Sequence, residues 1–310
     1  MLSITLQTPW LIAVSGGGDS IALLHMLLQQ GNKNHLTVAC FNHNWSTWGT
    51  QATHFVQTFC QQHNLPFVTA TGQGRGAHNA EELARTERLN WFAEICQTHK
   101  LKGVILAHTQ TDNVETFLMR AGKGSGLQGL SAMAEHTHLS TTHGPLHIWR
   151  PLLHLSRQHL RDYLAEHNQP YLEDPSNTEA TSQRAKIRQL LPQLEKVGIP
   201  AHAVAASIAS LQRANAALHN TLQTLIPNIQ KTTPTTLQIP LPWLLSQPTE
   251  YQLLLLAHCQ QQLAPQTQIP RTTKRQQLLT RLAENPKGKS TLGPLQFTWN
   301  STRLTVSHNS

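Results

Sequence analysis

Short apolar runs alternate with longer periodic segments along the first third of the chain. The short runs lie at 10–14, 36–41, 66–70 and 103–107, and the periodic segments lie at 21–28, 50–63 and 83–96. Short runs bounded by Pro, Gly or polar residues are typical of buried β-strands, and apolar residues every three or four positions indicate α-helices. Strands that alternate with helices predict an α/β fold with a Rossmann-like parallel sheet covered on both faces.

Helical periodicity continues from about residue 200, and proline-rich segments separate this helix from a second apolar helix around 253–259. The final stretch, 292–306, alternates apolar and polar residues, which predicts a small antiparallel hairpin. We therefore expect two domains, an α/β domain over 1–195 and a smaller, mainly helical domain over 196–310.

Cysteine usage and hydropathy bear on the compartment. The four cysteines are scattered and form no C-x-x-C pair, which is typical of reduced thiols in a cytoplasm and offers neither a zinc site nor a disulfide framework. The N-terminus has no basic segment ahead of an apolar one, so we expect no signal peptide. The longest apolar run, near 253–257, is too short to cross a bilayer. These features predict a cytoplasmic protein without a membrane partner.

Charge is distributed unevenly along the chain. Residues 1–180 hold 11 Lys/Arg against 13 Asp/Glu, whereas residues 181–310 hold 13 against 3. A basic, acid-poor region is typical of nucleic-acid binding, although a merely soluble basic surface is the alternative. The candidate contacts are Arg184, Lys186 and Arg188 in one cluster and Arg271, Lys274 and Arg275 in another. Arg184 and Arg188 would share a helix face and repel each other, which a phosphate-bearing partner would relieve; a solvated helix face is the alternative.

The segment Ser15-Gly16-Gly17-Gly18-Asp19-Ser20 connects the first predicted strand to the first predicted helix. Glycines allow the backbone to approach a phosphate closely, and a helix N-terminus offers free N–H groups and the positive end of its dipole. Ser15 and Ser20 add hydroxyl donors, whereas Asp19 would repel phosphate unless it caps the helix or holds a metal cation. The segment predicts a phosphate-binding loop, with an ordinary glycine turn as the alternative.

A second polar group follows the fourth predicted strand. If Thr111 caps the next helix, Asp112 and Glu115 lie three residues apart and face the same way, close to His108 at the strand end. Ligands of parallel sheets bind at the carboxyl ends of the strands, where the glycine loop would also lie. The pattern predicts a magnesium or proton-handling cluster; complementing the helix dipole is the alternative.

Six ordered motifs over about residues 11–192 resemble those of the tRNA(Ile)-lysidine synthetases, a family of the PP-loop (N-type) ATP pyrophosphatases. The glycine loop matches S-G-G-x-D-S, the run from Asn79 to Arg88 is similar to N-x-E-x-x-A-R-x-x-R, and the run from Ala107 to Thr116 is similar to A-H-x-x-D-D-x-x-E-T. The remaining matches are the glycines at 124–130, Arg150-Pro151-Leu152, and Glu173-Asp174-Pro175-Ser176-Asn177 followed by Arg184 and Arg188.

The resemblance implies that ATP adenylates carbon 2 of the wobble cytidine in a CAU-anticodon tRNA(Ile), after which the amine of free L-lysine displaces AMP. The loop from Ser15 to Ser20 would hold the ATP phosphates, with Mg²⁺ on Asp19 or Asp112. His108, Asp112 and Glu115 would position the lysine amine and accept its proton. Arg85 and Arg88 would bind phosphate or stabilise the adenylated intermediate. A homodimer is an assembly that we leave open.

The chain departs from the family pattern after the second strand, where a D-H-G-L-R-like run reads Asn42-His43-Asn44-Trp45-Ser46. Only His43 is kept, and Asn42 and Ser46 stand where the family pattern has Asp and Arg. Two other functions stay open: a thiolating PP-loop tRNA enzyme, which would need cysteines in its motifs, and a non-catalytic, nucleotide-dependent RNA-binding module. Four histidines between 134 and 147 follow no metal-binding template.

Overall fold

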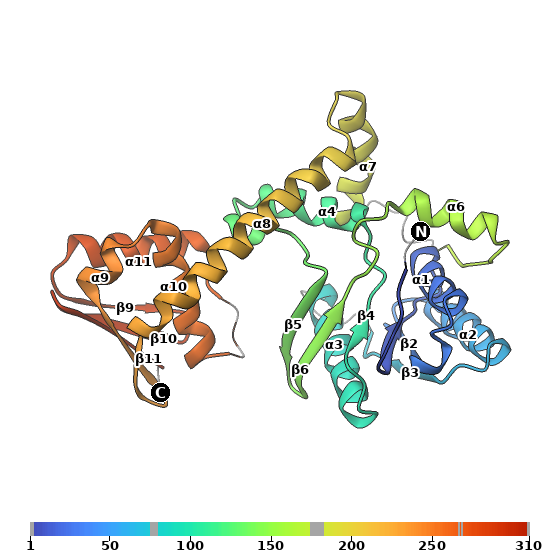
Figure 1. Cartoon of the computed structure of the whole chain (residues 1–310), viewed down its shortest axis with the longest axis horizontal. Helices are drawn as coiled ribbons and strands as arrows, with labels where there is room; N and C mark the ends of the chain where they lie inside the picture. Colours follow the sequence, from blue (N-terminus) through green and yellow to red (C-terminus); the bar gives the residue numbers. More distant parts are fainter. Residues whose placement is uncertain (1–2, 75–79, 174–182, 266, 268, 309–310) are drawn as a thin grey trace. The chain divides into compact units, whose positions relative to one another are not determined.

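The computed structural model describes residues 3–74, 80–173, 183–265, 267 and 269–308. The chain divides into two compact units (Figure 1). The N-terminal unit comprises Met1–Met119 and Ala132–Ile208, and the C-terminal unit comprises Arg120–Ser131 and Ala209–Ser310. Each unit has its own sheet and its own hydrophobic core.

The N-terminal unit is built on a six-stranded sheet in the order β3-β2-β1-β4-β6-β5. Its strands are β1 (Trp10–Ala13), β2 (Leu36–Asn42), β3 (Phe67–Thr71), β4 (Val104–Ile105), β5 (His136–Thr141) and β6 (Gly144–Trp149). All neighbouring pairs run parallel except β5 and β6, which form an antiparallel edge. The predicted mainly parallel α/β sheet is confirmed, and the β5–β6 hairpin extends it beyond the four strands expected.

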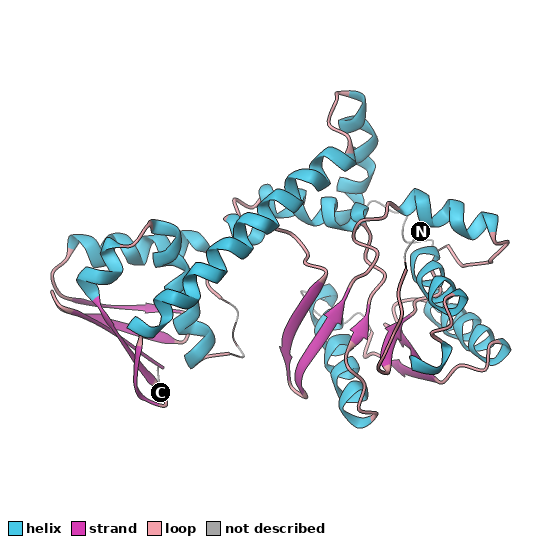
Figure 2. Cartoon of the chain, viewed as in Figure 1, coloured by secondary structure: helices cyan, strands magenta, loops and turns pink. Residues whose placement is uncertain are grey.

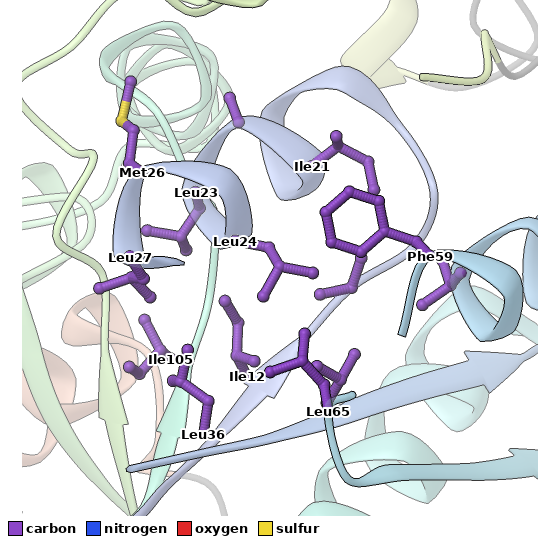
Figure 3. Packing of buried hydrophobic residues seen from close by; sticks show 14 of the residues in the cluster. Ile12, Ile21, Leu23, Leu24, Met26, Leu27, Leu36, Phe59, Leu65 and Ile105 are labelled. Atoms are coloured by element: carbon purple, nitrogen blue, oxygen red, sulfur yellow. The ribbon is translucent and has the colours of Figure 1, made fainter. Parts of the chain in front are cut away.

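Helices cover both faces of this sheet. Helices α1 (Gly18–Gln29) and α2 (Thr47–Gln62) pack on one face and α3 (Ala80–Thr98) packs on the other. The unit also contains η1 (Lys33–His35), most of α4 (Gln110–Ala121), α6 (Arg157–Glu166) and α7 (Gln183–Lys196), whereas α5 (Leu127–Leu130) belongs to the C-terminal unit. Side chains alternate between faces along a strand, so Ile12 joins the core under α1, whereas Leu11 packs with Phe92 of α3. Figure 3 shows Ile12 below Leu24 and Ile105 below Leu27, both leucines of α1. Among the described helices, none combines the length and hydropathy needed to cross a bilayer.

The strand order places the polar segments of the sequence together. The chain adds β2 and β3 on one side of β1 and then returns to add β4 and β6 on the other side. A crevice forms at the carboxyl ends of the strands where the order reverses, between β1 and β4. The glycine loop follows β1 and His108 follows β4, so both lie at this crevice.

The C-terminal unit contains a five-stranded antiparallel sheet in the order β7-β8-β11-β10-β9 (Figure 2). Its strands are β7 (Gln230–Thr233), β8 (Thr236–Pro240), β9 (Gly288–Leu292), β10 (Leu295–Trp299) and β11 (Arg303–His308). Its helices are α8 (Ala201–Leu225, which begins in the N-terminal unit), η3 (Ile226–Asn228), α9 (Leu241–Ser246), α10 (Thr249–Leu263) and α11 (Thr272–Glu284).

The expectation of a mainly helical C-terminal domain was therefore wrong. Pro234, two residues before β8, and Pro240, its last residue, obscured this short strand. Within it Leu237 and Ile239 are buried and the other residues are not. The predicted terminal hairpin is the β10–β11 part of a larger sheet. Its inward side chains, including Phe297 and Leu304, form one core with the leucines of α10 and α11.

Candidate active site

The glycine loop is shaped by Ser20. The Ser20 hydroxyl donates to the carbonyl oxygen of Gly17 at 2.8 Å and accepts from the backbone N–H of Ser15 at 3.1 Å. Gly16 has a φ of +83°, in the left-handed region that favours glycine. Helix α1 begins at Gly18 and leaves its first N–H groups without partners inside the helix. The loop thus has the form of an anion site, although the Ser20 hydroxyl serves the loop itself.

The segment at 171–172 lies directly on this loop. Leu172 donates its backbone N–H to the carbonyl of Gly16 at 3.0 Å, and a Cβ added at Gly18 would lie 3.2 Å from the ring of Tyr171. A side chain at position 18 would therefore displace the Tyr171 ring. Sequence reasoning missed Tyr171. Glu173 follows, whereas Asp174 to Asn177 of the matching motif, like Asn79, lie outside the described residues.

Helix α4 begins with a capping box formed by Thr109 and Asp112. The Oδ2 atom of Asp112 accepts from the backbone N–H and the hydroxyl of Thr109, each at 2.8 Å, and the Asp112 N–H donates to the Thr109 hydroxyl at 3.3 Å. The expected cap at Thr111 was therefore wrong by two residues. Because Oδ2 is occupied in this way, the Oδ1 atom of Asp112 faces the other charged groups of the site.

Arg157, at the start of α6, connects the glycine loop to α4. Its Nε lies 3.0 Å from Oδ2 of Asp19, and its Nη2 lies 3.2 Å from Oδ1 of Asp112. Burial raises the pKa of Asp19 despite Arg157, whereas Arg157 and Arg184 outweigh burial and lower the pKa of Asp112. The directions differ because Arg184 and the Thr109 N–H lower the pKa of Asp112, whereas the charge of Asp112 raises the pKa of Asp19. Sequence reasoning missed Arg157, whose spacing from either aspartate gives no signal.

Glu115 is fully buried and paired with two arginines of α7. Arg184 Nε contacts Oε2 and Arg188 Nε contacts Oε1 of Glu115, each at 2.7 Å, and Arg184 Nη2 lies 3.6 Å from Oδ1 of Asp112. The two arginines were expected to repel each other unless a phosphate lay between them. Glu115 supplies that negative charge within the chain. It positions two guanidinium groups, and both of its oxygens are occupied.

A group of buried nitrogen atoms around His108 has no hydrogen-bond partner among the residues that the structure describes. They are Nδ1 of His43, Nδ1 of His108, Nε of Arg88 and Nε of Arg150. Burial lowers the pKa of Arg88 to about 10, and Arg85 adds to the effect. Burial also lowers the pKa of His108 to about 3; Asp112 opposes this, and Arg150, Arg184 and Arg88 reinforce it. The Nε–H groups of Arg88 and Arg150 are buried donors, which normally have partners, so this cluster is suited to an anionic ligand.

The segment that departs from the family pattern keeps its turn by other means. Asn42 Oδ1 accepts from the backbone N–H of Asn44 at 2.8 Å, which is the turn that an aspartate there would make. Asn44 has a φ of +57°, a conformation that Gly adopts most easily and Asn tolerates. His43 is thereby held beside the rings of Phe41 and Trp45, with centroids 5.0 and 5.2 Å away. The replaced Arg has no substitute here, because Ser46 stands in its place.

The proposed nucleic-acid contacts differ in exposure. Lys186, Arg271 and Lys274 are exposed. Arg275 is buried, and it donates to the carbonyl oxygens of Leu253 and Pro270 at 2.7 and 3.1 Å. Arg275 was predicted as a nucleic-acid contact, but its position in α11 turns its side chain into the core of the C-terminal unit.

Metal-binding capacity rests on the two aspartates. Within the described ranges, no group of three or more His, Cys, Asp or Glu side chains is arranged to hold a metal ion, and this includes the histidines of β5 and β6. Asp19 and Asp112 nevertheless meet at a single cation, the Arg157 guanidinium. Mg²⁺ that arrives with a nucleotide needs only one or two carboxylates, so this pair fits it.

Comparison with known proteins adds to these observations. A family model described as a PP-loop domain matches residues 4–194. Over 210 residues the chain is 35% identical to a tRNA(Ile)-lysidine synthase of Ruegeria pomeroyi, a match that covers 67% of this chain and 49% of that protein. Over 192 residues it is 36% identical to a tRNA(Ile)-lysidine synthase of Synechocystis sp., covering 60% of this chain and 57% of that protein. The chain spans about half the length of these relatives.

Among solved structures, the U34-tRNA thiolase NcsA from Methanococcus maripaludis, with its 4Fe-4S cluster, resembles the chain with a TM-score of 0.52. The two are 15% identical, and the match covers 67% of this chain and 74% of that chain. At this level of identity the likeness concerns the fold alone.

Proposed function

The chain belongs to the PP-loop domain family, as its motifs predicted, and we propose that it is a tRNA(Ile)-lysidine synthase. In the proposed reaction, the carbonyl oxygen on carbon 2 of the wobble cytidine of CAU-anticodon tRNA(Ile) attacks the α-phosphate of ATP, and pyrophosphate leaves. The ε-amine of L-lysine then attacks carbon 2 and loses a proton, and AMP leaves with that oxygen. The observation that carries the proposal is the convergence of the glycine loop, Asp112 and the unpartnered donors around His108 at one crevice.

The loop from Ser15 to Ser20 would bind the phosphates of ATP through backbone N–H groups at the start of α1. Asp19 and Asp112 would hold Mg²⁺, which offsets the negative charge that these carboxylates bring close to phosphate. When bound, Mg²⁺ would supply charge stabilisation as pyrophosphate leaves. The aspartates' contact with one guanidinium supports this assignment.

The basic cluster suits the second half of the reaction. Arg85, Arg88 and Arg150 would stabilise the negative charge on the phosphate of the departing AMP. With a pKa of about 3, His108 is a neutral imidazole at physiological pH and a weak proton acceptor. We assign it the positioning of the lysine amine by hydrogen bonding. Glu115 would act through Arg184 and Arg188, since both of its oxygens are paired.

For tRNA binding we propose the exposed cations Lys186, Arg271 and Lys274, with Arg184 and Arg188 presented by Glu115. In this assignment residues 1–195 carry the adenylation chemistry and 196–310 contribute to tRNA binding. We place the protein in the cytoplasm, and a homodimer is a further assembly to test by sedimentation.

A thiolating activity is the rival with a specific requirement. It would need accessible cysteines, but all four are buried free thiols. Burial raises the pKa of Cys60, Cys96 and Cys259 to about 12 and also raises that of Cys40. A thiol with a raised pKa is a poor nucleophile and a poor metal ligand. The cysteines therefore favour lysine ligation over sulfur transfer.

A two-step assay tests the proposal. Purified protein is incubated with ATP, Mg²⁺ and CAU-anticodon tRNA(Ile), and pyrophosphate is followed before and after lysine is added. We expect a tRNA-dependent burst of pyrophosphate without lysine and steady AMP release with it. A matched tRNA with a different anticodon should give neither. Pyrophosphate release that is indifferent to the tRNA would contradict the proposal.

A further inference from the structure

Arg157 is the one basic side chain in the described site that contacts both aspartates. Its guanidinium reaches Asp19, which lies in the loop after β1, and Asp112, which lies in the helix after β4. These carboxylates belong to segments more than 90 positions apart in the chain, and the contact to each is 3.0 or 3.2 Å. The Arg157 guanidinium thus holds the loop after β1 and the start of α4 at a set distance from each other.

The oxygen atoms that Arg157 occupies are those that a metal ion would need. Oδ2 of Asp112 is saturated by the two Thr109 donors, which leaves Oδ1, the atom that Arg157 Nη2 contacts. On Asp19, Arg157 Nε takes Oδ2. A divalent cation bridging the pair would therefore meet the guanidinium at Oδ1 of Asp112. Arg184 Nη2 also lies 3.6 Å from that oxygen, but Arg157 is closer, at 3.2 Å, and contacts Asp19 as well. A cation that bridges the two aspartates would therefore be repelled most strongly by Arg157.

The Arg157 side chain can also move away from the two aspartates without disturbing its helix. The side chain retains 22% of its exposure, and the residue opens α6, whose cap is made separately by Ser156 through the N–H of His159. Helix α6 keeps its buried contacts through Leu160, Tyr163 and Leu164. Losing the guanidinium contacts would thus leave the helix packed against the core.

We propose that Arg157 is a positioning residue that occupies the shared cation site of Asp19 and Asp112 in the nucleotide-free protein and yields it to Mg²⁺. Free metal then binds weakly, and the site fills when ATP brings its own ligands and charge. The proposal rests on the Mg²⁺ site of the proposed function and is independent of which RNA or amino acid is used.

The test measures Mn²⁺ binding to the full-length, nucleotide-free protein by the electron paramagnetic resonance signal of the free ion. Arg157→Gln removes the charge and keeps a side chain of similar length. We expect its Kd for Mn²⁺ to be about tenfold lower than that of the wild type, since the competing charge is gone. Arg157→Lys keeps the charge but cannot span both carboxylates, so its Kd for Mn²⁺ should lie between those of the wild type and Arg157→Gln.

Arg161→Gln is the matched control. Arg161 lies one turn further along α6 and contacts Glu173 at 3.7 Å. The variant loses the same charge but, among the described residues, no hydrogen bond or ion pair to Asp19 or Asp112, and the charge of Arg161 acts on Asp19 only through space. We expect its Kd for Mn²⁺ to change less than about twofold. Methylguanidinium at millimolar concentration should compete with Mn²⁺ in Arg157→Gln and leave the wild type unaffected.

Unchanged or weaker Mn²⁺ binding in a folded Arg157→Gln protein would overturn the proposal, because Arg157 would then only hold the carboxylates in place. If Arg157→Gln does not fold, the Arg157→Lys value decides by the same criterion. Equal tightening in Arg161→Gln would reduce the effect to net charge and would also overturn it. Failure of lysine transfer would leave these results standing, which separates this proposal from the proposed function.

Discussion

Replacing Glu115 by Gln should release α7 from the N-terminal unit. Helix α7 contributes no buried side chain of its own, so it is held chiefly by the contacts of Arg184 and Arg188 with Glu115, to which Arg184 adds a longer contact with Asp112. In Glu115→Gln one paired oxygen becomes an amide nitrogen that faces a guanidinium, and two positive charges lose their common partner. The variant tests whether this buried carboxylate holds the helix.

The size of the effect follows from the burial of each partner. Removing one member of a buried ion pair costs about 3–5 kcal/mol. Glu115 is fully buried, but Arg184 and Arg188 are 36% and 27% exposed, so water can solvate them when the contact is lost. We therefore expect about 2 kcal/mol, which is roughly a 30-fold change in an equilibrium constant. Since α7 can detach without unfolding the sheet, the cost should appear as local opening.

Hydrogen exchange followed by mass spectrometry measures this opening. Peptides covering 183–196 should exchange about 30-fold faster in Glu115→Gln, while those of β1 and α1 keep the wild-type rate. Glu195→Gln, on the exposed surface of the same helix, is the control and should leave exchange unchanged. A change of less than about threefold across 183–196 would refute the reasoning, since an anchoring contact cannot be removed without that consequence.

Three further predictions concern the loop, the basic residues and pH. Asp19→Ala should abolish tRNA-dependent pyrophosphate release without lowering the melting temperature by more than about 4 °C; retained release would mean that the loop has another role. Arg271→Gln and Lys274→Gln should each reduce by about one the slope of log K for tRNA binding against log salt concentration, and slopes equal to that of the wild type would remove these residues from the tRNA contacts. Arg275→Gln should instead destabilise the C-terminal unit. Burial and Arg88 lower the pKa of His43 to about 4, so the folded protein binds this proton more weakly than the unfolded chain. The free energy of unfolding should fall as pH drops from about 6.5 to about 4, by up to about 1.4 kcal/mol per pH unit. Urea titrations at several pH values measure this slope, and a His43→Asn variant with the same slope as the wild type would refute the assignment.

Much of the N-terminal unit could be predicted because its signals are local. Apolar runs such as Trp10–Ala13 are bounded by turn residues, and buried parallel strands read as continuous apolar segments. The strand β6 escaped prediction because Pro145 and His147 interrupt its apolar residues, so that only Leu146 and Ile148 mark it. In β8 the alternation is equally short and lies between prolines. Such strands are specified by their neighbours in the sheet more than by their own pattern.

In the candidate site, too, features set by local sequence could be predicted and contacts between distant segments could not. Residues within the loop and the start of α4 could be identified from spacing, because their geometry is set within one turn of chain. The partners that decide their chemistry could not: Arg157 and Tyr171 reach the loop from more than 130 positions away. Arg275 shows the reverse error, since a basic residue on a helix was assumed to be exposed although its guanidinium satisfies buried carbonyls.

The central claim is that the chain joins lysine to the wobble cytidine, and the modified nucleoside itself tests this most directly. CAU-anticodon tRNA(Ile) is incubated with the protein, ATP, Mg²⁺ and isotopically labelled lysine, then digested to nucleosides and analysed by mass spectrometry. The account predicts a cytidine that carries the labelled lysine, formed only with ATP and lost in Asp19→Ala. An unmodified cytidine from folded protein and intact tRNA, or a sulfur-containing nucleoside when a sulfur donor is supplied, would contradict it.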